Sequence, residues 1–326
     1  MNLKLINKAE LFQGRNKTKN YFEGWYFKNV SSDQQKVISV IPGVSIDTYN
    51  KHAFIQTIIN NTNSNFNKIE THYHRFSIDD FLYYDNPFGI IIGNNKFSCD
   101  GIELNLKDND YSLNGKLKFS KLSKIKTSVV QPNTMGFFAY FPFMECYHEI
   151  ISMNHTLSGS INLNKEIINF EHGKGYIEKD WGISFPKDYI WIQSNNFENP
   201  TVSIMCSIAN IPFIGTAFKG FICNLAINNT EYRFASYNLS KIKLVEYNGN
   251  NIKVLIEKDD LLLNIDAKMT NGGSLKAPKN GVMKHTIKEG LNGVVFIKLT
   301  KKSGEVIFSE TGNCCGIEIV ESLELN

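Results

Sequence analysis

The hydrophobic positions along the chain fall into short segments that predict β-strands. Each segment is rich in β-branched and aromatic residues, and clusters of Asn, Gly, Asp and Lys separate one from the next. A spacing of roughly ten residues per strand is typical of antiparallel meanders and not of alternating strands and helices. The expected strands are 37–44, 52–59, 201–211, 218–227, 251–258, 261–269 and 293–300.

Helical signals are weak throughout the chain. The apolar segment 134–145 contains Pro142, which would interrupt the backbone hydrogen bonds of a helix. We therefore expect a buried loop there and an all-β protein. Because so many strands would expose unpaired edges, we also expect the sheets to close into two barrels that pack together.

Two segments place acidic side chains beside large aromatic ones. The first, YFEGWYF, covers residues 21–27, and the second covers residues 171–197. Strand-like sequence follows each of them, which suggests two related β units, each opened by a Trp-bearing strand. A chain of 326 residues also exceeds one ordinary domain. Glycines near residue 174 interrupt the pattern, so we predict domains of residues 1–174 and 175–326.

The composition and the distribution of apolar residues argue against several classes of protein. A formal net charge of +3 and only three arginines argue against a nucleic-acid-binding surface. None of the six cysteines forms a CxxC pair, so we expect reduced, structural thiols. The N-terminal residues lack the apolar core of a signal peptide, and no apolar run approaches a membrane span. We therefore expect a cytoplasmic protein, for which peripheral membrane contact stays open.

Four motifs resemble the tocopherol cyclase family, and their order and spacing are similar to those of its bacterial members. They are YFEGWYF (21–27), FMECYHEIISMNHTLSGSI (143–161), GKGYIEKDWGISFPKDYIWIQSNNF (173–197) and GGSLKAPKNGVMKHTIKEGL (272–291). The resemblance extends from about Tyr21 to Val320. It implies two lipocalin-like antiparallel β-barrels, an architecture similar to that of carotenoid hydratases and Diels–Alderase-like cyclases.

The resemblance also implies an activity, a cyclisation without cofactor. In that reaction a prenylated benzoquinol closes to a chromanol: the prenyl double bond is protonated, and the phenol oxygen attacks the tertiary carbocation. Such a protein would be an isomerase of the intramolecular lyase type, and its partner would be a hydrophobic prenylated small molecule. We expect no transit peptide of the kind found in the plant enzymes, so the family is a firmer inference than the tocopherol substrate.

Protonating an alkene requires an acid that is shielded from water. The catalytic candidates are Asp180, Glu178 and Glu23. Strand alternation puts Glu178 and Asp180 on one face and Lys179 and Trp181 on the other. The competing interpretation is structural: Lys179 or another lysine neutralises Glu178 or Asp180, and Glu23 bonds backbone amides or an arginine.

Aromatic and amide side chains predict the substrate-binding wall. Strand alternation puts Trp191, Gln193 and Asn195 on one face, where the indole would stabilise a cation and the amides would bind hydroxyls. We assign the same binding role to Trp25, Tyr26 and Trp181, and we expect His52 and His148 to orient a quinol hydroxyl or accept its proton.

Two histidines raise the question of a metal. His72 and His74 have the spacing of metal ligands on a strand, but no third ligand is evident, so we predict neither a metal nor another cofactor. GxSxG, Walker A and GxGxxG elements are absent from the sequence, which removes support for triad hydrolysis, nucleotide hydrolysis and dinucleotide binding.

Two other functions stay open. A non-catalytic lipocalin-like protein would bind an apolar prenyl lipid with the pocket alone, whereas an enzyme also needs a buried, protonatable acid. A hydratase of a prenyl double bond would use the same acid and admit water. The sequence does not distinguish cyclisation from hydration, nor does it fix the substrate chain length or the oligomeric state.

Overall fold

The computed structural model describes residues 5–61, 69–108, 111–213 and 216–321. These residues form an almost entirely β protein, as predicted, and no α-helix occurs among them. The helical turns are short 3-10 segments at Ile78–Asp80, Gly136–Tyr140 and Ser236–Asn238. In the described part of the chain, no helix is long and apolar enough to cross a membrane.

The chain forms two compact units. Unit 1 comprises Met1–Phe185 and Leu275–Thr286, and unit 2 comprises Pro186–Ser274 and Ile287–Asn326. The predicted boundary after Lys174 differs from this division, because the strand that begins there is central to the sheet of unit 1. Strand pairing fixes this division more strongly than the glycines that interrupt the hydrophobic pattern.

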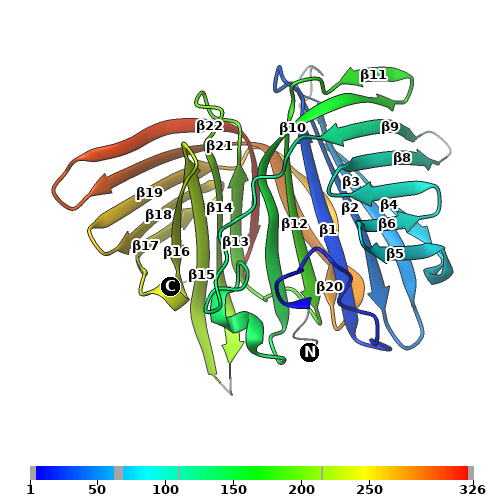
Figure 1. Ribbon diagram of the computed structural model, residues 1–326, viewed down its shortest axis with the longest axis horizontal. Coiled ribbons are helices and arrows are strands. Elements are labelled where there is room, and N and C mark those ends of the chain that lie inside the picture. Colours follow the sequence, from blue (N-terminus) through cyan, green and yellow to red (C-terminus); the bar gives the residue numbers. More distant parts are fainter. Residues whose placement is uncertain (1–4, 62–68, 109–110, 214–215, 322–326) are drawn as a thin grey trace. The chain divides into compact units, whose positions relative to one another are not determined.

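Unit 1 is built on a 12-stranded antiparallel sheet in the order β4-β3-β2-β1-β12-β10-β9-β8-β7-β6-β5, with β11 paired to β10 (Figure 1). Its strands are β1 (Tyr21–Val30), β2 (Lys36–Ile46), β3 (His52–Asn61), β4 (Ile69–Phe76), β5 (Phe81–Asp85), β6 (Phe88–Ile92), β7 (Asn95–Ser98), β8 (Gly101–Lys107), β9 (Ser112–Phe119), β10 (Cys146–Leu163), β11 (Glu166–Asn169) and β12 (Lys174–Gly182).

Unit 2 is built on a 10-stranded antiparallel sheet in the order β16-β15-β14-β13-β22-β21-β19-β18-β17, with β20 paired to β21. Its strands are β13 (Tyr189–Ser194), β14 (Ser203–Phe213), β15 (Thr216–Ile227), β16 (Thr230–Ala235), β17 (Lys241–Asn248), β18 (Asn251–Lys258), β19 (Leu261–Lys268) and β22 (Val306–Val320). The hairpin of β20 (Gly272–Lys279) and β21 (Val282–Lys301) contributes its turn to unit 1 and its remaining residues to unit 2.

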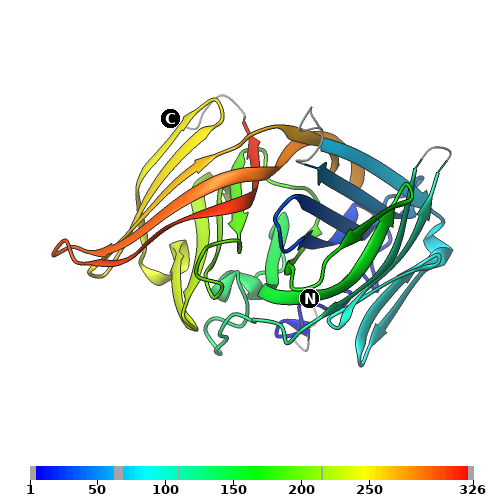
Figure 2. The same cartoon turned by 90° about the horizontal axis from the view of Figure 1, so that it is seen from above.

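The predicted closure into barrels is not found, and a lipocalin-like arrangement stays a prediction. Among the described residues β4 pairs only with β3, and β5 pairs only with β6, so both edges of the unit 1 sheet are open. The sheet instead folds over itself, as Figure 2 shows for the blue and cyan strands. Ring contacts such as Trp25–Phe88 and Phe27–Phe97 join its two halves in one core.

All seven predicted strands correspond to observed ones, and unit 2 has its own core of aliphatic residues from β13 to β22. The expected buried loop at 134–145 is only partly correct. Met135 and Ala139 are buried, but Phe137, Tyr140 and Phe143 are exposed on the short helical turn and after it.

Candidate functional site

The central strands of unit 1 carry most of the predicted site. β12, from the first part of the second aromatic-acid segment, lies between β1 and β10 and so pairs with the first segment. The rest of the second segment contains β13, the first strand of unit 2, which carries Trp191. In the register of β1 and β12, Glu23 lies opposite Trp181, and Tyr26 lies opposite Glu178. Directly opposed residues share a face of the sheet. Strand alternation therefore separates the predicted residues onto two faces.

One face holds a completely buried ion pair between Glu23 and Lys179. The Lys179 Nζ and a Glu23 carboxylate oxygen are 2.5 Å apart, and neither side chain is exposed to solvent. The Tyr21 hydroxyl donates to the same carboxylate at 2.5 Å. Burial lowers the pKa of Lys179, and the charge of Glu23 opposes that effect. A lysine does neutralise one of the predicted acids, but that acid is Glu23 and not a neighbour of Lys179 in sequence.

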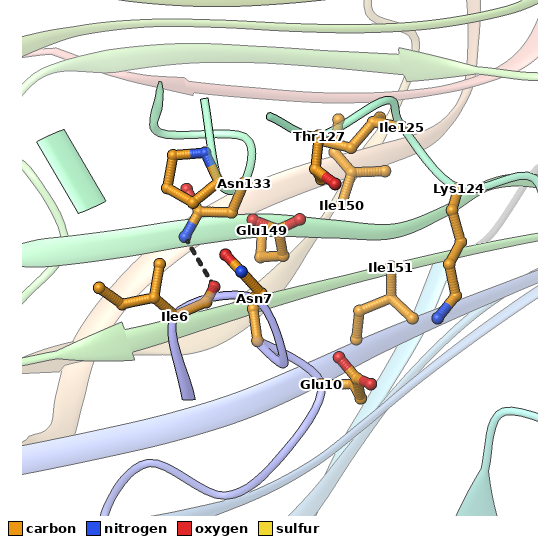
Figure 3. Close-up of a pocket in the computed structure, with 12 residues that line it drawn as sticks. Ile6, Asn7, Glu10, Lys124, Ile125, Thr127, Asn133, Glu149, Ile150 and Ile151 are labelled. Atoms are coloured by element: carbon orange, nitrogen blue, oxygen red, sulfur yellow. Dashed lines mark hydrogen bonds between the residues drawn. The ribbon is translucent and has the colours of Figure 1, made fainter. Parts of the chain in front are cut away.

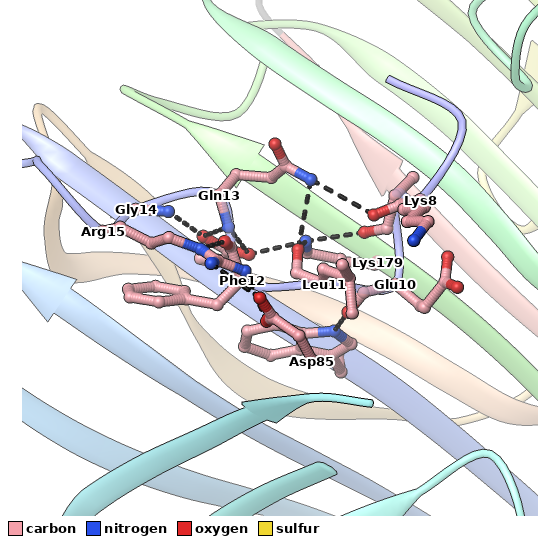
Figure 4. A network of polar contacts seen from close by, with 12 residues as sticks. Lys8, Glu10, Leu11, Phe12, Gln13, Gly14, Arg15, Asp85 and Lys179 are labelled. Atoms are coloured by element: carbon pink, nitrogen blue, oxygen red, sulfur yellow. Dashed lines mark hydrogen bonds and ion pairs between the residues drawn. The ribbon is translucent and has the colours of Figure 1, made fainter. Parts of the chain in front are cut away.

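Hydrogen bonds to this ion pair hold the N-terminal segment against the sheet (Figure 4). Lys179 donates to the carbonyl oxygens of Ala9 and Leu11 at 2.7 and 2.6 Å. The backbone amides of Gln13 and Gly14 donate to the Glu23 carboxylate. Every polar group of the pair is thereby satisfied, as buried charges require.

The rings of Trp25 and Trp181 enclose the same ammonium group. Their centroids lie 4.8 and 4.6 Å from the Lys179 Nζ, which is the geometry of cation–π contacts. The Trp25 indole also donates to the carbonyl oxygen of Glu10 at 2.8 Å. These two aromatic faces, predicted to stabilise a substrate cation, already contact a cation of the protein itself.

The opposite face gathers His148, Glu178 and Asp180 into one cluster. The His148 Nδ1 and an Asp180 carboxylate oxygen are 2.9 Å apart, and the His148 Nε2 lies 3.7 Å from a Glu178 oxygen. The Tyr176 hydroxyl donates to that same Glu178 oxygen at 2.6 Å. The group combines two carboxylates, one imidazole and one phenol, which is a set of residues able to hold and transfer protons.

The electrostatics of this cluster keep a proton on the imidazole. Burial alone would lower the pKa of His148, but the charges of Asp180 and Glu178 outweigh that effect and raise the pKa to about 9. Burial and the charge of Glu178 also raise the pKa of Tyr176 well above its usual value. At neutral pH, therefore, His148 is an imidazolium and Tyr176 is a hydrogen-bond donor.

Asp180 is the most accessible member of the cluster. Its side chain is 21% exposed, compared with 7% for Glu178. Across the sheet Asp180 faces Gly24, which has no side chain to cover it. A methyl group added at Gly24 would make an ordinary van der Waals contact with Ile41 at 3.6 Å. Asp180 is therefore the side chain of the cluster that is most open to solvent.

The same three residues have the composition of a metal site. Ligand atoms of His148, Glu178 and Asp180 lie within 4.8 Å of one another. Metal binding needs a deprotonated imidazole nitrogen, so a metal ion would have to displace the proton that a pKa of about 9 keeps on His148 in the metal-free protein. His72 and His74, the pair with metal-like spacing, stack on the ring of Tyr111 instead.

A small pocket lies beside β10, away from this cluster (Figure 3). Its volume is about 60 Å³, and its walls come from the N-terminal segment, residues 124–133 and β10. Glu149, which lines the pocket, lies opposite Lys179 in the register of β10 and β12. Its side chain is therefore on the face of the sheet that holds the ion pair of Glu23 and Lys179. A cavity of this size holds about two water molecules, so it is too small for a prenylated ring.

Of the other predicted binding residues, Tyr26 lies opposite Glu178 on the face of the cluster, and the rest lie on other strands. His52 is on β3, where its ring nitrogens contact the Asn50 carbonyl and the Tyr73 hydroxyl at 2.9 and 2.6 Å. The Tyr26 hydroxyl accepts a hydrogen bond from Ser39 at 3.0 Å. Those in unit 2 are buried on β13 or just after it: Trp191, Gln193 and Asn195.

A family model described as tocopherol cyclase-like matches residues 111–320 of the chain. The chain belongs to this family. The chloroplastic tocopherol cyclase of Zea mays is 25% identical over 206 residues, which cover 58% of this chain and 42% of the maize protein. The chain thus spans less than half the length of that relative.

Solved structures of other proteins have a fold similar to that of this chain. CghA in complex with Sch210972 has a TM-score of 0.60 at 8% identity, with 93% of this chain and 89% of that chain covered. Kievitone hydratase from Nectria haematococca has a TM-score of 0.52 at 12% identity, with 95% and 93% covered. At these identities the likeness concerns the fold alone.

Two contacts of the site were not predicted from the sequence. The pairing of His148 with Asp180 joins residues 32 positions apart, and only the register of β10 against β12 brings them together. For the hydrogen bond from Tyr176 to Glu178 the sequence did contain an indication, because the two residues are two positions apart and so lie on one face of a strand. That spacing indicated a shared face but not a contact.

Proposed function

We propose that this protein is a cofactor-independent cyclase that closes a prenylated benzoquinol to a chromanol. The observation that carries the proposal is the cluster of His148, Glu178 and Asp180, which combines a protonated imidazole with two carboxylates in a largely buried position. Membership of the tocopherol cyclase-like family supports the same reaction class.

In this proposal Asp180 delivers the proton. Its carboxyl group protonates the prenyl double bond, which leaves a tertiary carbocation on the substrate and a carboxylate on Asp180. The imidazolium of His148, at 2.9 Å, stabilises that carboxylate as it forms. The phenol oxygen then attacks the cation, a C–O bond forms, and the phenol proton returns to the cluster, so the reaction is redox-neutral.

The net charge of the cluster changes when the substrate becomes a carbocation. In the resting cluster both carboxylates are ionised around the His148 imidazolium, and in the proposed reactive state Asp180 has taken up one further proton. With Glu178 ionised, His148 protonated and Asp180 carrying that proton, the cluster is neutral. Once Asp180 loses the proton, the cluster has one net negative charge beside the positive carbocation. Opposite charges at close range in a site shielded from water attract each other strongly, which lowers the energy of the intermediate. Glu178, fixed by Tyr176, keeps His148 charged throughout.

The test is conversion of reduced prenylated benzoquinols of graded chain length, followed by mass spectrometry. A product of unchanged mass indicates cyclisation, and a gain of one water indicates the hydratase. Binding without conversion indicates the carrier. The Asp180→Asn variant should lower turnover by about 10²- to 10⁴-fold, the usual contribution of a general acid.

Two controls separate chemistry from folding. Asp266→Asn changes an exposed aspartate of β19 in the same way and should leave turnover unchanged. The Asp180→Asn protein should fold, and its melting temperature at neutral pH should fall by no more than that of His148→Gln, because the two variants remove the same ion pair. Full turnover in Asp180→Asn, Glu178→Gln and Glu23→Gln alike would refute the assignment of all three carboxylates.

A further inference from the structure

The connection between β9 and β10 exposes an unusual number of apolar side chains. We call residues 120–143 the docking loop. Val129 and Val130 are 87% and 71% exposed, and Phe143 is 55% exposed. On the short helical turn between them, Phe137 and Tyr140 are also exposed. Neighbouring apolar side chains that stay in water on a folded protein commonly mark a contact surface.

Hydrogen bonds hold these side chains together at one place. The Tyr140 hydroxyl donates to the Val129 carbonyl oxygen at 2.7 Å, which joins the valine arm of the loop to the aromatic arm. The Tyr147 hydroxyl on β10 donates to the Phe141 carbonyl oxygen at 2.5 Å. The exposed side chains therefore belong to a fixed surface and not to a loose chain.

The base of the docking loop is fastened to the sheet as well. The backbone amide of Thr134 donates to the Glu149 carboxylate at 2.8 Å, and the Thr134 hydroxyl accepts from the amide of Ile150 at 2.9 Å. Because the base is bound to β10, the loop can present its apolar side chains without refolding. Little conformational entropy would be lost when a partner covers them.

The charges of the docking loop point to the partner. Lys121, Lys124 and Lys126 are exposed and precede the valines, and residues 120–143 contain no aspartate or glutamate. Aromatic and aliphatic side chains beside lysines are the combination by which proteins bind the interface of a bilayer. The lysines attract anionic head groups, and the apolar side chains enter the boundary with the acyl chains.

We propose that the docking loop binds this protein to the surface of an anionic lipid bilayer. A bilayer fits the combined observations better than a protein partner, because every charged residue of the docking loop is a lysine, and lysines beside exposed aromatic and aliphatic side chains complement an anionic bilayer surface. This interaction does not depend on the proposed cyclisation. A protein that docks without converting any quinol would still satisfy it.

Sedimentation with lipid vesicles tests the proposal. The full chain should bind vesicles of phosphatidylcholine and phosphatidylglycerol at least tenfold more tightly than vesicles of phosphatidylcholine alone. A variant with Phe137→Ser and Phe143→Ser should lose at least tenfold in binding to the mixed vesicles. The matched control is Ile167→Ser, which removes a 72% exposed apolar side chain from β11 and should change nothing.

The lysines are tested separately. Replacing Lys121, Lys124 and Lys126 by glutamine should remove most of the preference for phosphatidylglycerol, since each lysine near an anionic surface contributes about fivefold. Three other exposed lysines of unit 1 provide the control, and their replacement by glutamine should have a much smaller effect: Lys107, Lys118 and Lys165.

Hydrogen exchange on the unchanged protein keeps the test independent of how the variants fold. The amides of residues 129–143 should exchange more slowly when mixed vesicles are present. The proposal is wrong if no vesicle binds, or if the serine variant binds as well as its control. It is also wrong if the protein self-associates without lipid and the serine variant abolishes that association, because the surface would then contact a second copy.

Discussion

Lys179→Met should destabilise unit 1 by about 3–5 kcal/mol, which is the usual cost of leaving one partner of a buried ion pair alone. The Glu23 carboxylate would stay fully buried without its counter-ion. Two further contacts would disappear, the hydrogen bonds to the carbonyls of Ala9 and Leu11. For a unit of this size each kcal/mol lowers the melting temperature by about 2–4 °C. The expected decrease is therefore roughly 6–20 °C.

Urea unfolding followed by tryptophan fluorescence measures this change, because Trp25 and Trp181 both lie against the Lys179 ammonium. The double variant Glu23→Gln with Lys179→Met should be less destabilised than the sum of the two single variants, since no buried charge remains unpaired. Lys302→Met, which breaks the exposed pair with Glu257, is the control and should cost less than about 1 kcal/mol.

Two results would refute this reasoning. One is a cost below about 1 kcal/mol for Lys179→Met, which is the range of an exposed ion pair. The other is strict additivity in the double variant, which would mean that Glu23 and Lys179 stabilise the fold through separate contacts.

Three further predictions concern the two faces of the central strands. The pKa of His148 is raised from 6.5 to about 9, so protonation of this imidazole stabilises the folded protein by up to about 3 kcal/mol. This stabilisation is complete below pH 6.5 and is lost as the pH rises through 9. Between these two pH values the melting temperature should fall more in the unchanged protein than in His148→Gln. Gly24→Ala should raise stability by about 0.5–1 kcal/mol in chemical unfolding, since its methyl group meets only ordinary contacts, and a loss of stability would contradict this. Gly175→Ala should cost about 1–3 kcal/mol in chemical unfolding, because its methyl group would lie 2.1 Å from the His155 Nε2, and an unchanged midpoint would count against it.

The sequence predicted the type of fold well but the connections poorly. The all-β character followed from short β-branched segments, and each expected strand is present. The strands β5 to β9 were not among the expected ones, because several of their positions are exposed and the hydrophobic signal is diluted. The separation of Asp180 from Trp181 was predictable, since neighbours on a strand point to opposite faces.

What the sequence could not supply was the register between distant strands. Glu23 and Lys179 are far apart in the chain, and both were weighed separately as an acid and a neutralising base. Only the pairing of β1 with β12 makes them partners. The same pairing puts β12, the first part of the second aromatic-acid segment, in unit 1, whereas β13, which follows in the same segment, is in unit 2.

The most direct test of the proposed chemistry is turnover of a reduced prenylated benzoquinol in deuterium oxide. If an exchangeable acid of the protein protonates the double bond, the chromanol should contain one deuterium atom, on the ring carbon that was the hydrogen-bearing carbon of the alkene. Mass spectrometry would show an increase of one mass unit at that position in every molecule of product. A chromanol without deuterium at that carbon, or no chromanol at all, would contradict the proposal.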